Sequence, residues 1–238
     1  MLLVTGASSE VGVAMISRIV KDYDVIFAHY CRSDAELLKL REENGDKIKL
    51  VQADFSDADS VQKMIAEIRD TGHEINQIVH LAAPKLRYLK FAKAGWDQFE
   101  EGMRTSLQSI VEICGAFMPA MAKKKYGRVI FMLTSCTENV PPKYLSPYVT
   151  VKYALLGLMK SLAAEYAEKG ITVNGVSPDM METRFLSEVS DIIVEKSAMT
   201  SPLGRNLTVQ DAVPAFEYLL SDAAAAMTGQ NLVVSGGR

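Results

Sequence analysis

The sequence contains few of the residues on which metal-binding and disulfide-stabilised proteins depend. Its 238 residues include three cysteines, three histidines and one tryptophan. The cysteines, Cys31, Cys114 and Cys136, are odd in number, far apart and without a Cys-x-x-Cys pair. This pattern predicts neither a disulfide framework nor a zinc site, and it is typical of reduced thiols in the cytoplasm. We therefore expect a cytoplasmic protein with no bound metal.

An excess of charge is also missing, as are long apolar runs. The formal net charge of -3 gives no general attraction to nucleic acid. The one basic cluster, 123–125, precedes Gly127 and is interpreted as a solvated helix end. No secretory leader and no run long enough to cross a bilayer is visible. We expect neither nucleic acid nor a membrane to be a partner.

What the sequence does have is a regular alternation of two patterns. Short apolar, β-rich runs without polar alternation are typical of strands covered on both faces, and longer helical patterns separate them. This alternation predicts an α/β, doubly wound Rossmann-type fold with a seven-stranded, mainly parallel sheet, in one domain spanning 1–238. The predicted strands are 2–5, 25–29, 47–52, 77–81, 128–134, 172–177 and 231–235, and the predicted helices are 11–21, 34–43, 58–70, 97–122, 146–168 and 208–221.

Two helix starts carry capping signals. Ser33 with Glu36 predicts a capping box for the second helix, and Ser56 with Asp59 predicts an N-cap for the third. Glycines at 45, 72 and 170 fall where helices are expected to end.

The first strand-to-helix turn, 5–12, reads Thr-Gly-Ala-Ser-Ser-Glu-Val-Gly. Gly6 permits a tight turn, the small residues after it let a ligand approach the backbone, and a helix N-terminus favours a pyrophosphate. Glycine in such turns also has purely steric uses, but the position at the first βα turn favours dinucleotide binding. The second strand ends without an acidic residue for a ribose diol. Arg32 could pair with a 2′-phosphate and Ser33 could donate a hydroxyl, which favours NADP(H) over NAD(H).

A second candidate site consists of Ser135, Tyr148 and Lys152. A spacing of four places the phenol and the ammonium on one face of a helix. The free phenol has a pKa of about 10, and a lysine charge beside it favours the phenolate. The spacing arises easily by chance, however, and an ordinary amphipathic helix with one packed tyrosine and one solvated lysine is the alternative.

Taken together, these motifs resemble the short-chain dehydrogenase/reductase family, and the match runs over nearly the whole chain. The first turn resembles that family's cofactor loop, and Ser135, Tyr148 and Lys152 follow its order and spacing. The other segments that carry the resemblance are 170–178, Met181-Glu182-Thr183 and 228–237.

The resemblance implies a reaction. NADPH would deliver a hydride to a carbonyl carbon while Tyr148 gives a proton to the oxygen, and in the oxidative direction Tyr148 would act as the base. Lys152 would lower the tyrosine pKa and bind the nicotinamide ribose, and Ser135 would hold the substrate oxygen. The cofactor-binding residues implied are Gly6, Ser8, Ser9, Glu10, Val11, Gly12, Tyr30, Arg32, Ser33, Asp54, Phe55, Ala82, Ala83, Tyr148, Lys152, Pro178, Met181 and Thr183.

Family members commonly form homotetramers or homodimers through the helices at 97–122 and 146–168. Leu155, Leu158 and Met159 are candidates for such an interface, and they could equally face the sheet.

Four positions depart from the family pattern. Glu10 replaces the middle glycine of the cofactor loop, and we expect it to turn outward and cap the helix start. His80 stands where an asparagine is usual and is interpreted as a hydrogen-bonded structural residue. Ser106 takes the place of the family's fourth catalytic residue, an asparagine, and Asp179 replaces a glycine.

Substrate and function remain open among three hypotheses. The segment at about 184–206 is expected to form a substrate lid, and its apolar residues suit an acyl chain or simply pack the lid. Together with 202–205, which resembles 3-oxoacyl-carrier-protein reductases, the lid favours a 3-oxoacyl thioester reductase. A reductase or dehydrogenase of a sugar, polyol or secondary metabolite is the alternative. The third hypothesis, suggested by Glu10, His80 and Ser106, is a cofactor-binding sensor or assembly partner with weakened catalysis, and the intact trio argues against it.

Overall fold

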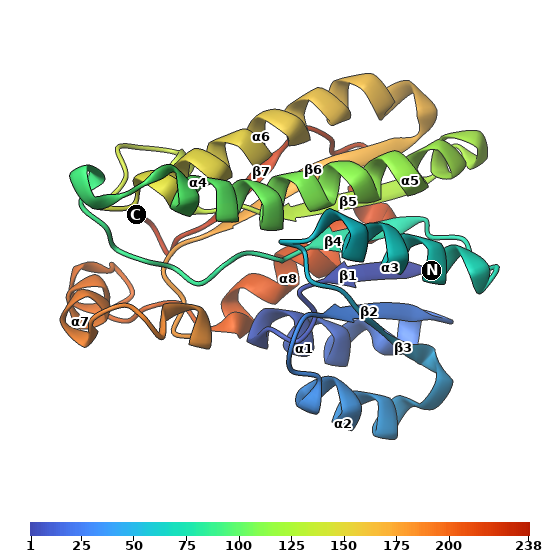
Figure 1. The fold of residues 1–238 in the computed structure, drawn as a ribbon, viewed down its shortest axis with the longest axis horizontal. Coiled ribbons are helices and arrows are strands. Elements are labelled where there is room, and N and C mark those ends of the chain that lie inside the picture. Colours follow the sequence, from blue (N-terminus) through green and yellow to red (C-terminus); the bar gives the residue numbers. More distant parts are fainter.

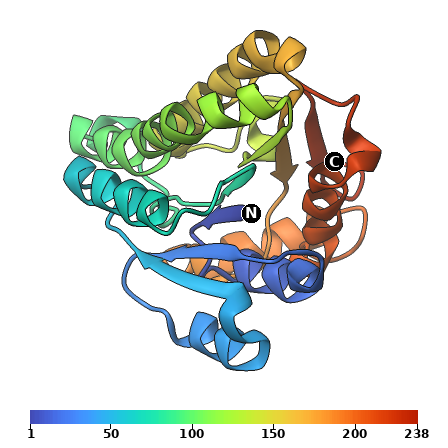
Figure 2. The ribbon, with the colours of Figure 1, turned by 90° about the vertical axis from the view of Figure 1, so that its right-hand side faces the viewer.

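The computed structural model describes residues 1–238 as a sheet between two layers of helices (Figures 1 and 2). The seven strands lie in the order β3-β2-β1-β4-β5-β6-β7, and every neighbouring pair is parallel. The predicted fold is confirmed, and the sheet is wholly parallel. The strands are β1 (Leu2–Thr5), β2 (Ile26–Tyr30), β3 (Ile48–Gln52), β4 (Gln77–His80), β5 (Gly127–Met132), β6 (Ile171–Pro178) and β7 (Asn231–Val234).

The helices divide between the two faces of the sheet. One apolar core of 22 buried residues joins the sheet to α1, α2 and α8, and another of 28 joins its other face to α3, α5 and α6. Burial on both faces explains why the strands are continuous apolar runs. The helices are α1 (Glu10–Ile19), α2 (Ala35–Asn44), α3 (Ala58–Asp70), α4 (Trp96–Gly102), α5 (Ser109–Lys124), α6 (Ser146–Tyr166), α7 (Asp191–Thr200) and α8 (Val209–Leu220). No helix is long and apolar enough to cross a membrane.

The predicted helix at 97–122 is not one uniform α-helix. Between α4 and α5 the chain forms a π-helical segment, Met103–Gln108. Within it, the Ser106 carbonyl accepts a hydrogen bond from His80 Nε2 (2.8 Å), and the Ser106 hydroxyl donates to the Ala82 carbonyl (3.1 Å). The wider turn therefore occurs where the helix backbone also bonds the chain that follows β4.

Both predicted helix caps are wrong by one residue. Asp34, not Ser33, precedes α2, and its side chain makes no capping bond. At α3 the Asp57 carboxylate accepts from the Asp59 amide, while the Ser56 hydroxyl donates to Asp54. In each case the helix begins one residue later than the expected cap implies, so the aspartate that follows the serine occupies the N-cap position.

Candidate active site

A cavity of about 1080 Å³ opens at the carboxyl ends of the strands. Its walls come from the loops after all the strands from β1 to β6, around the point between β1 and β4 where the strand order reverses. This is the usual ligand crevice of doubly wound sheets. Of the expected cofactor residues, those that line it are Gly6, Ser8, Ser9, Glu10, Val11, Arg32, Ser33, Asp54, Phe55, Ala82, Ala83, Tyr148, Lys152, Pro178, Met181 and Thr183. Gly12, Tyr30, Ser106 and Ser135 are not among its lining residues.

The turn between β1 and α1 has the shape that a dinucleotide needs. Gly6 has a φ of +66°, and a Cβ there would lie 2.9 Å from the Ala82 nitrogen, so only glycine fits. Ser9 caps α1 by accepting from the Gly12 amide (3.1 Å). The cavity therefore meets a helix N-terminus across a glycine turn, an arrangement that fits a pyrophosphate.

Two buried histidines form hydrogen bonds to residues of this turn. His29 Nδ1 accepts from the Gly6 amide (3.0 Å), and its Nε2 donates to the Ala53 carbonyl (3.0 Å). His80 Nδ1 accepts from the Thr5 hydroxyl (2.7 Å), and its Nε2 donates to Ser106. Because carbonyls only accept, both rings are assigned the Nε2–H tautomer. Burial lowers the pKa of His29 to about 4 and that of His80 to about 3, so both are neutral and structural at pH 7.

Glu10 does not cap α1, because Ser9 already does. Instead its Oε1 accepts from the Arg184 backbone amide (3.0 Å) and from Arg184 Nε (2.8 Å). Arg184 Nη2 also donates to the Ser8 carbonyl (3.2 Å). The expected cap is therefore wrong: the glutamate joins the cofactor loop to the segment that follows β6 and holds a guanidinium beside the turn.

Tyr148 and Lys152 lie on α6 and face the same cavity. Lys152 is buried, its Nζ lies 5.7 Å from the centroid of the Tyr148 ring, and it donates to the Met132 carbonyl (2.7 Å). Burial lowers the pKa of Lys152 to about 8. Burial raises the pKa of Tyr148, and a hydrogen bond with Thr134 offsets this only in part. Desolvation outweighs the other influences on the Tyr148 pKa in the chain alone.

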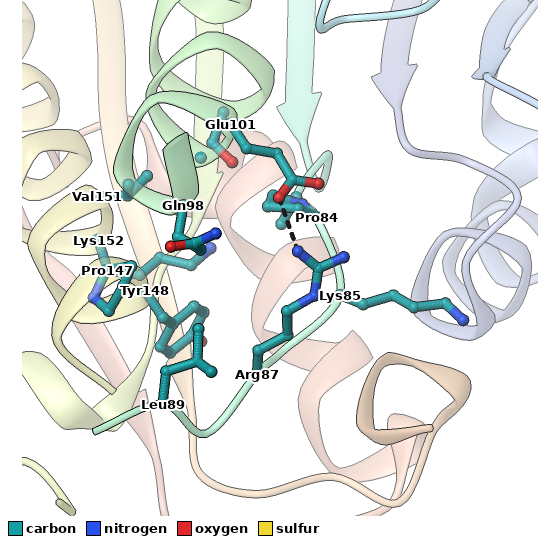
Figure 3. Close-up of a pocket in the computed structure, with 13 residues that line it drawn as sticks. Pro84, Lys85, Arg87, Leu89, Gln98, Glu101, Pro147, Tyr148, Val151 and Lys152 are labelled. Atoms are coloured by element: carbon teal, nitrogen blue, oxygen red, sulfur yellow. Dashed lines mark hydrogen bonds and ion pairs between the residues drawn. The ribbon is translucent and has the colours of Figure 1, made fainter. Parts of the chain in front are cut away.

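Behind Tyr148 and Lys152 lies a smaller hollow of about 40 Å³, large enough for water (Figure 3). Ser106 lines it, so the structure brings this residue beside Lys152. Both polar groups of Ser106 already have partners, His80 and Ala82. On the far side Arg87 pairs with Glu101 (3.0 Å).

Ser135 follows β5, and its hydroxyl is engaged in a hydrogen bond within the chain. Its Oγ donates to Asp179 Oδ1 (3.2 Å), and the other carboxylate oxygen accepts from Arg238 Nη1 (2.8 Å). Asp179 and Arg238 both line the large cavity, at its edge nearest α7. A serine, a carboxylate and a guanidinium therefore form a chain of hydrogen bonds at the edge of the cavity nearest α7.

Comparison with known proteins agrees with this geometry. The family model described as enoyl-(acyl carrier protein) reductase matches residues 6–238. The chain belongs to the short-chain dehydrogenase/reductase family. It is an oxidoreductase of that family. It is 30% identical to the 3-oxoacyl-acyl-carrier-protein reductase FabG of Escherichia coli, over 99% of this chain and 95% of that protein. It is also 29% identical to nodulation protein G of Azospirillum brasilense, over 99% and 96%.

Solved structures show the same fold. A putative gluconate dehydrogenase from Agrobacterium tumefaciens superposes with a TM-score of 0.90 at 21% identity, covering 100% of this chain and 94% of that one. A gluconate 5-dehydrogenase from Burkholderia cenocepacia, solved with NADP and tartrate, has a TM-score of 0.88 at 23% identity, with 99% and 93% covered.

The wall of the cavity in this family member combines apolar and charged side chains. Of the expected apolar lid residues, Phe185, Leu186 and Ile193 line the cavity, while Ile192, Met199 and Leu203 are exposed. Arg205 pairs with Asp211 at the start of α8 and does not line the cavity. The charged side chains that line the cavity include Lys85, Arg87, Glu101, Lys143, Asp179, Glu188, Lys196 and Arg238.

Several site residues were not found from the sequence. Thr134 directly precedes Ser135, and Arg184 directly follows Thr183. This neighbourhood is the only sign in the sequence that they belong to the site. His29 and Arg238 carry none, because their partners are distant in the sequence.

Proposed function

We propose that the chain is an NADP(H)-dependent oxidoreductase that interconverts a carbonyl and a secondary alcohol. One observation carries the proposal: Tyr148 and Lys152 line the same cavity as the Gly6 turn and Thr183. A proton donor and a dinucleotide cradle are the two parts that such a reaction needs side by side.

The cofactor would lie along the loops that end β1, β2, β4 and β6. The α1 N-terminus would bind the pyrophosphate, and Thr183 would contact the nicotinamide carboxamide. When bound, NADPH supplies the hydride.

The protein supplies proton transfer and orientation. Because burial raises the pKa of Tyr148, the phenol is protonated at neutral pH and is in the acid form that carbonyl reduction requires. Lys152, with a pKa of about 8, carries its charge at pH 7 and would stabilise the phenolate that forms. Ser135 would donate to the substrate oxygen after turning away from Asp179. Ser106 would act only through the water-sized hollow beside Lys152.

The preference for NADP(H) rests on Arg32 and Ser33, which line the cavity at the end of β2. We expect Arg32→Ala to weaken NADPH binding about tenfold, because a charge-assisted hydrogen bond to the 2′-phosphate is lost. NADH affinity should change less than twofold. Fluorescence titration with both cofactors measures this, and equal losses for NADPH and NADH would contradict the preference.

Two substrate classes fit this reaction. A 3-oxoacyl thioester is supported by the FabG relatives at 30% identity. A hydroxylated ketone, such as a sugar or polyol derivative, is supported by the charged wall of the cavity. NADPH consumption should be followed with acetoacetyl-CoA, keto-sugars and cyclic ketones. Tight NADPH binding without consumption across this panel would instead support the cofactor-binding sensor.

We further propose a homodimer or homotetramer formed through α5 and α6, which lie on the same side of the sheet (Figures 1 and 2). Leu155 and Met159 cannot be its contacts, because both are fully buried in the core. The outer faces of these helices carry Val111, Gly115, Tyr153 and Gly157 instead, and both glycines leave open space for a partner.

A further inference from the structure

Asp179 places a negatively charged carboxylate in the wall of the cavity where a carbonyl would be reduced. It directly follows Pro178 at the end of β6, its side chain is 19% exposed, and it lines the cavity. A carboxylate beside a carbonyl oxygen that becomes negative is unfavourable unless its own charge is balanced and its oxygens are used. Arg238 balances the charge and bonds Oδ2.

The remaining oxygen, Oδ1, takes the only hydrogen of the Ser135 hydroxyl. Ser135 cannot donate to Asp179 and to a substrate carbonyl at the same time. When Ser135 turns to a simple ketone, Oδ1 loses its donor inside a partly closed cavity, and that loss weakens binding.

A hydroxyl on the substrate removes this conflict. Ser135 Oγ and Asp179 Oδ1 lie 3.2 Å apart, a spacing close to that of two oxygens on adjacent carbon atoms. The carbonyl oxygen can take the serine hydrogen while the neighbouring hydroxyl donates to Oδ1. All donors and acceptors of the pair are then used.

We propose that Asp179 is a specificity residue that accepts a hydrogen bond from a hydroxyl on the carbon next to the reacting carbonyl. The preferred substrate is then an α-hydroxy ketone of the sugar or polyol type. A 3-oxoacyl thioester carries CH₂ groups beside its ketone, which cannot donate. The inference rests on the proposed function and selects between its two substrate classes.

The surroundings of Asp179 agree with a polyhydroxylated substrate. Arg238 is fixed by Ser197 and Thr200 of α7, so the carboxylate is held in place. Burial is the main reason that the pKa values of Tyr88 and Cys136 are raised, and the negative charge of Asp179 raises both further. Tyr88 and Ser197 also line the cavity and offer hydroxyls for further substrate oxygens. The Thr200 hydroxyl already donates to backbone carbonyls of α7.

The test compares two ketones that differ only in the group at issue. In 1-hydroxybutan-2-one a hydroxyl stands where pentan-3-one has a methyl. We expect the native chain to reduce the hydroxy ketone with a kcat/KM about tenfold or more above that for pentan-3-one. Asp179→Gly should abolish this preference, lower the hydroxy-ketone value and leave or raise the values for pentan-3-one and acetoacetyl-CoA.

Arg238→Ala is the matched control, since it breaks the same tether to α7 and keeps the carboxylate. It should lower kcat/KM for both ketones, because the carboxylate is then uncompensated, and it should keep the preference for the hydroxy ketone. A native preference below twofold, an unchanged preference in Asp179→Gly, or an equal loss of preference in Arg238→Ala would overturn the inference. If the inference fails in one of these ways but some ketone is still reduced with NADPH, the proposed function stands. If no ketone is reduced, both the inference and the proposed function are overturned.

Discussion

At the scale of single residues, two neutral imidazoles hold the turn that would carry the pyrophosphate. His29 bonds the Gly6 amide and His80 bonds the Thr5 hydroxyl, so consecutive residues of the turn each depend on one ring. A protonated ring has no acceptor nitrogen. Either contact is therefore lost when its histidine gains a proton.

This arrangement predicts loss of stability in mild acid. The pKa values of His29 and His80 are about 4 and about 3 in the folded chain, below the ordinary 6.5, so the unfolded chain binds more protons in that interval. The stabilisation is complete above pH 6.5. As the pH falls below 6.5, the free energy of unfolding should drop by about 1.4 kcal/mol per pH unit for each ring.

Urea unfolding between pH 7 and 5 measures this slope above the range where ordinary carboxylates titrate. His29→Gln and His80→Gln should each remove about half of it. An unchanged slope in both variants would show that the rings are not held neutral.

The Asp57 cap of α3, the Thr134–Tyr148 contact and the Glu10–Arg184 pair could not be read from the sequence. Each depends on a side-chain direction or on a partner far away along the chain, up to 174 residues for Glu10 and Arg184. The spacing of Ser135, Tyr148 and Lys152, by contrast, depends on one helix and one strand end, which local pattern specifies.

At the scale of elements, the cofactor loop and the segment after β6 are joined across the cavity. Glu10 on α1 holds Arg184, which also reaches the Ser8 carbonyl. The arginine neutralises a carboxylate that would otherwise repel a pyrophosphate at the helix N-terminus. The pair compensates for the missing glycine of the family loop.

We predict that Arg184→Ala weakens NADPH binding about fivefold, since Glu10 is then uncompensated and the pair is partly exposed. Adding Glu10→Gln to Arg184→Ala should restore most of the affinity, because the repelling charge is gone. Arg18→Ala is the matched control: it breaks the Arg18–Glu217 pair between α1 and α8, outside the cavity. Calorimetric titration measures the NADPH affinity of the native chain, Arg184→Ala, the double variant and Arg18→Ala. A double variant that binds NADPH more weakly than Arg184→Ala would contradict this compensation of charge.

At the scale of the whole molecule, the doubly wound sheet brings the glycine turn after the first strand and Tyr148 of the sixth helix to one cavity. The sheet could be predicted because its strands are buried on both faces and therefore read as continuous apolar runs. The π-helical segment at Met103–Gln108 could not, since it coincides with a hydrogen bond to His80 on a different element. The charged side chains of the cavity could not be predicted either, because they come from loops that only the folded chain brings together.

The central claim is hydride transfer to a carbonyl with Tyr148 as the proton donor. Its most direct test uses NADPH deuterated at C4 on the transferred side, with mass spectrometry of the alcohol formed from 1-hydroxybutan-2-one or another reduced ketone. The native chain should place one deuterium on the new carbinol carbon. Tyr148→Phe should form this product at least about a hundredfold more slowly while still binding NADPH. Labelled alcohol formed by Tyr148→Phe at the native rate, or unlabelled alcohol from the native chain, would contradict the account.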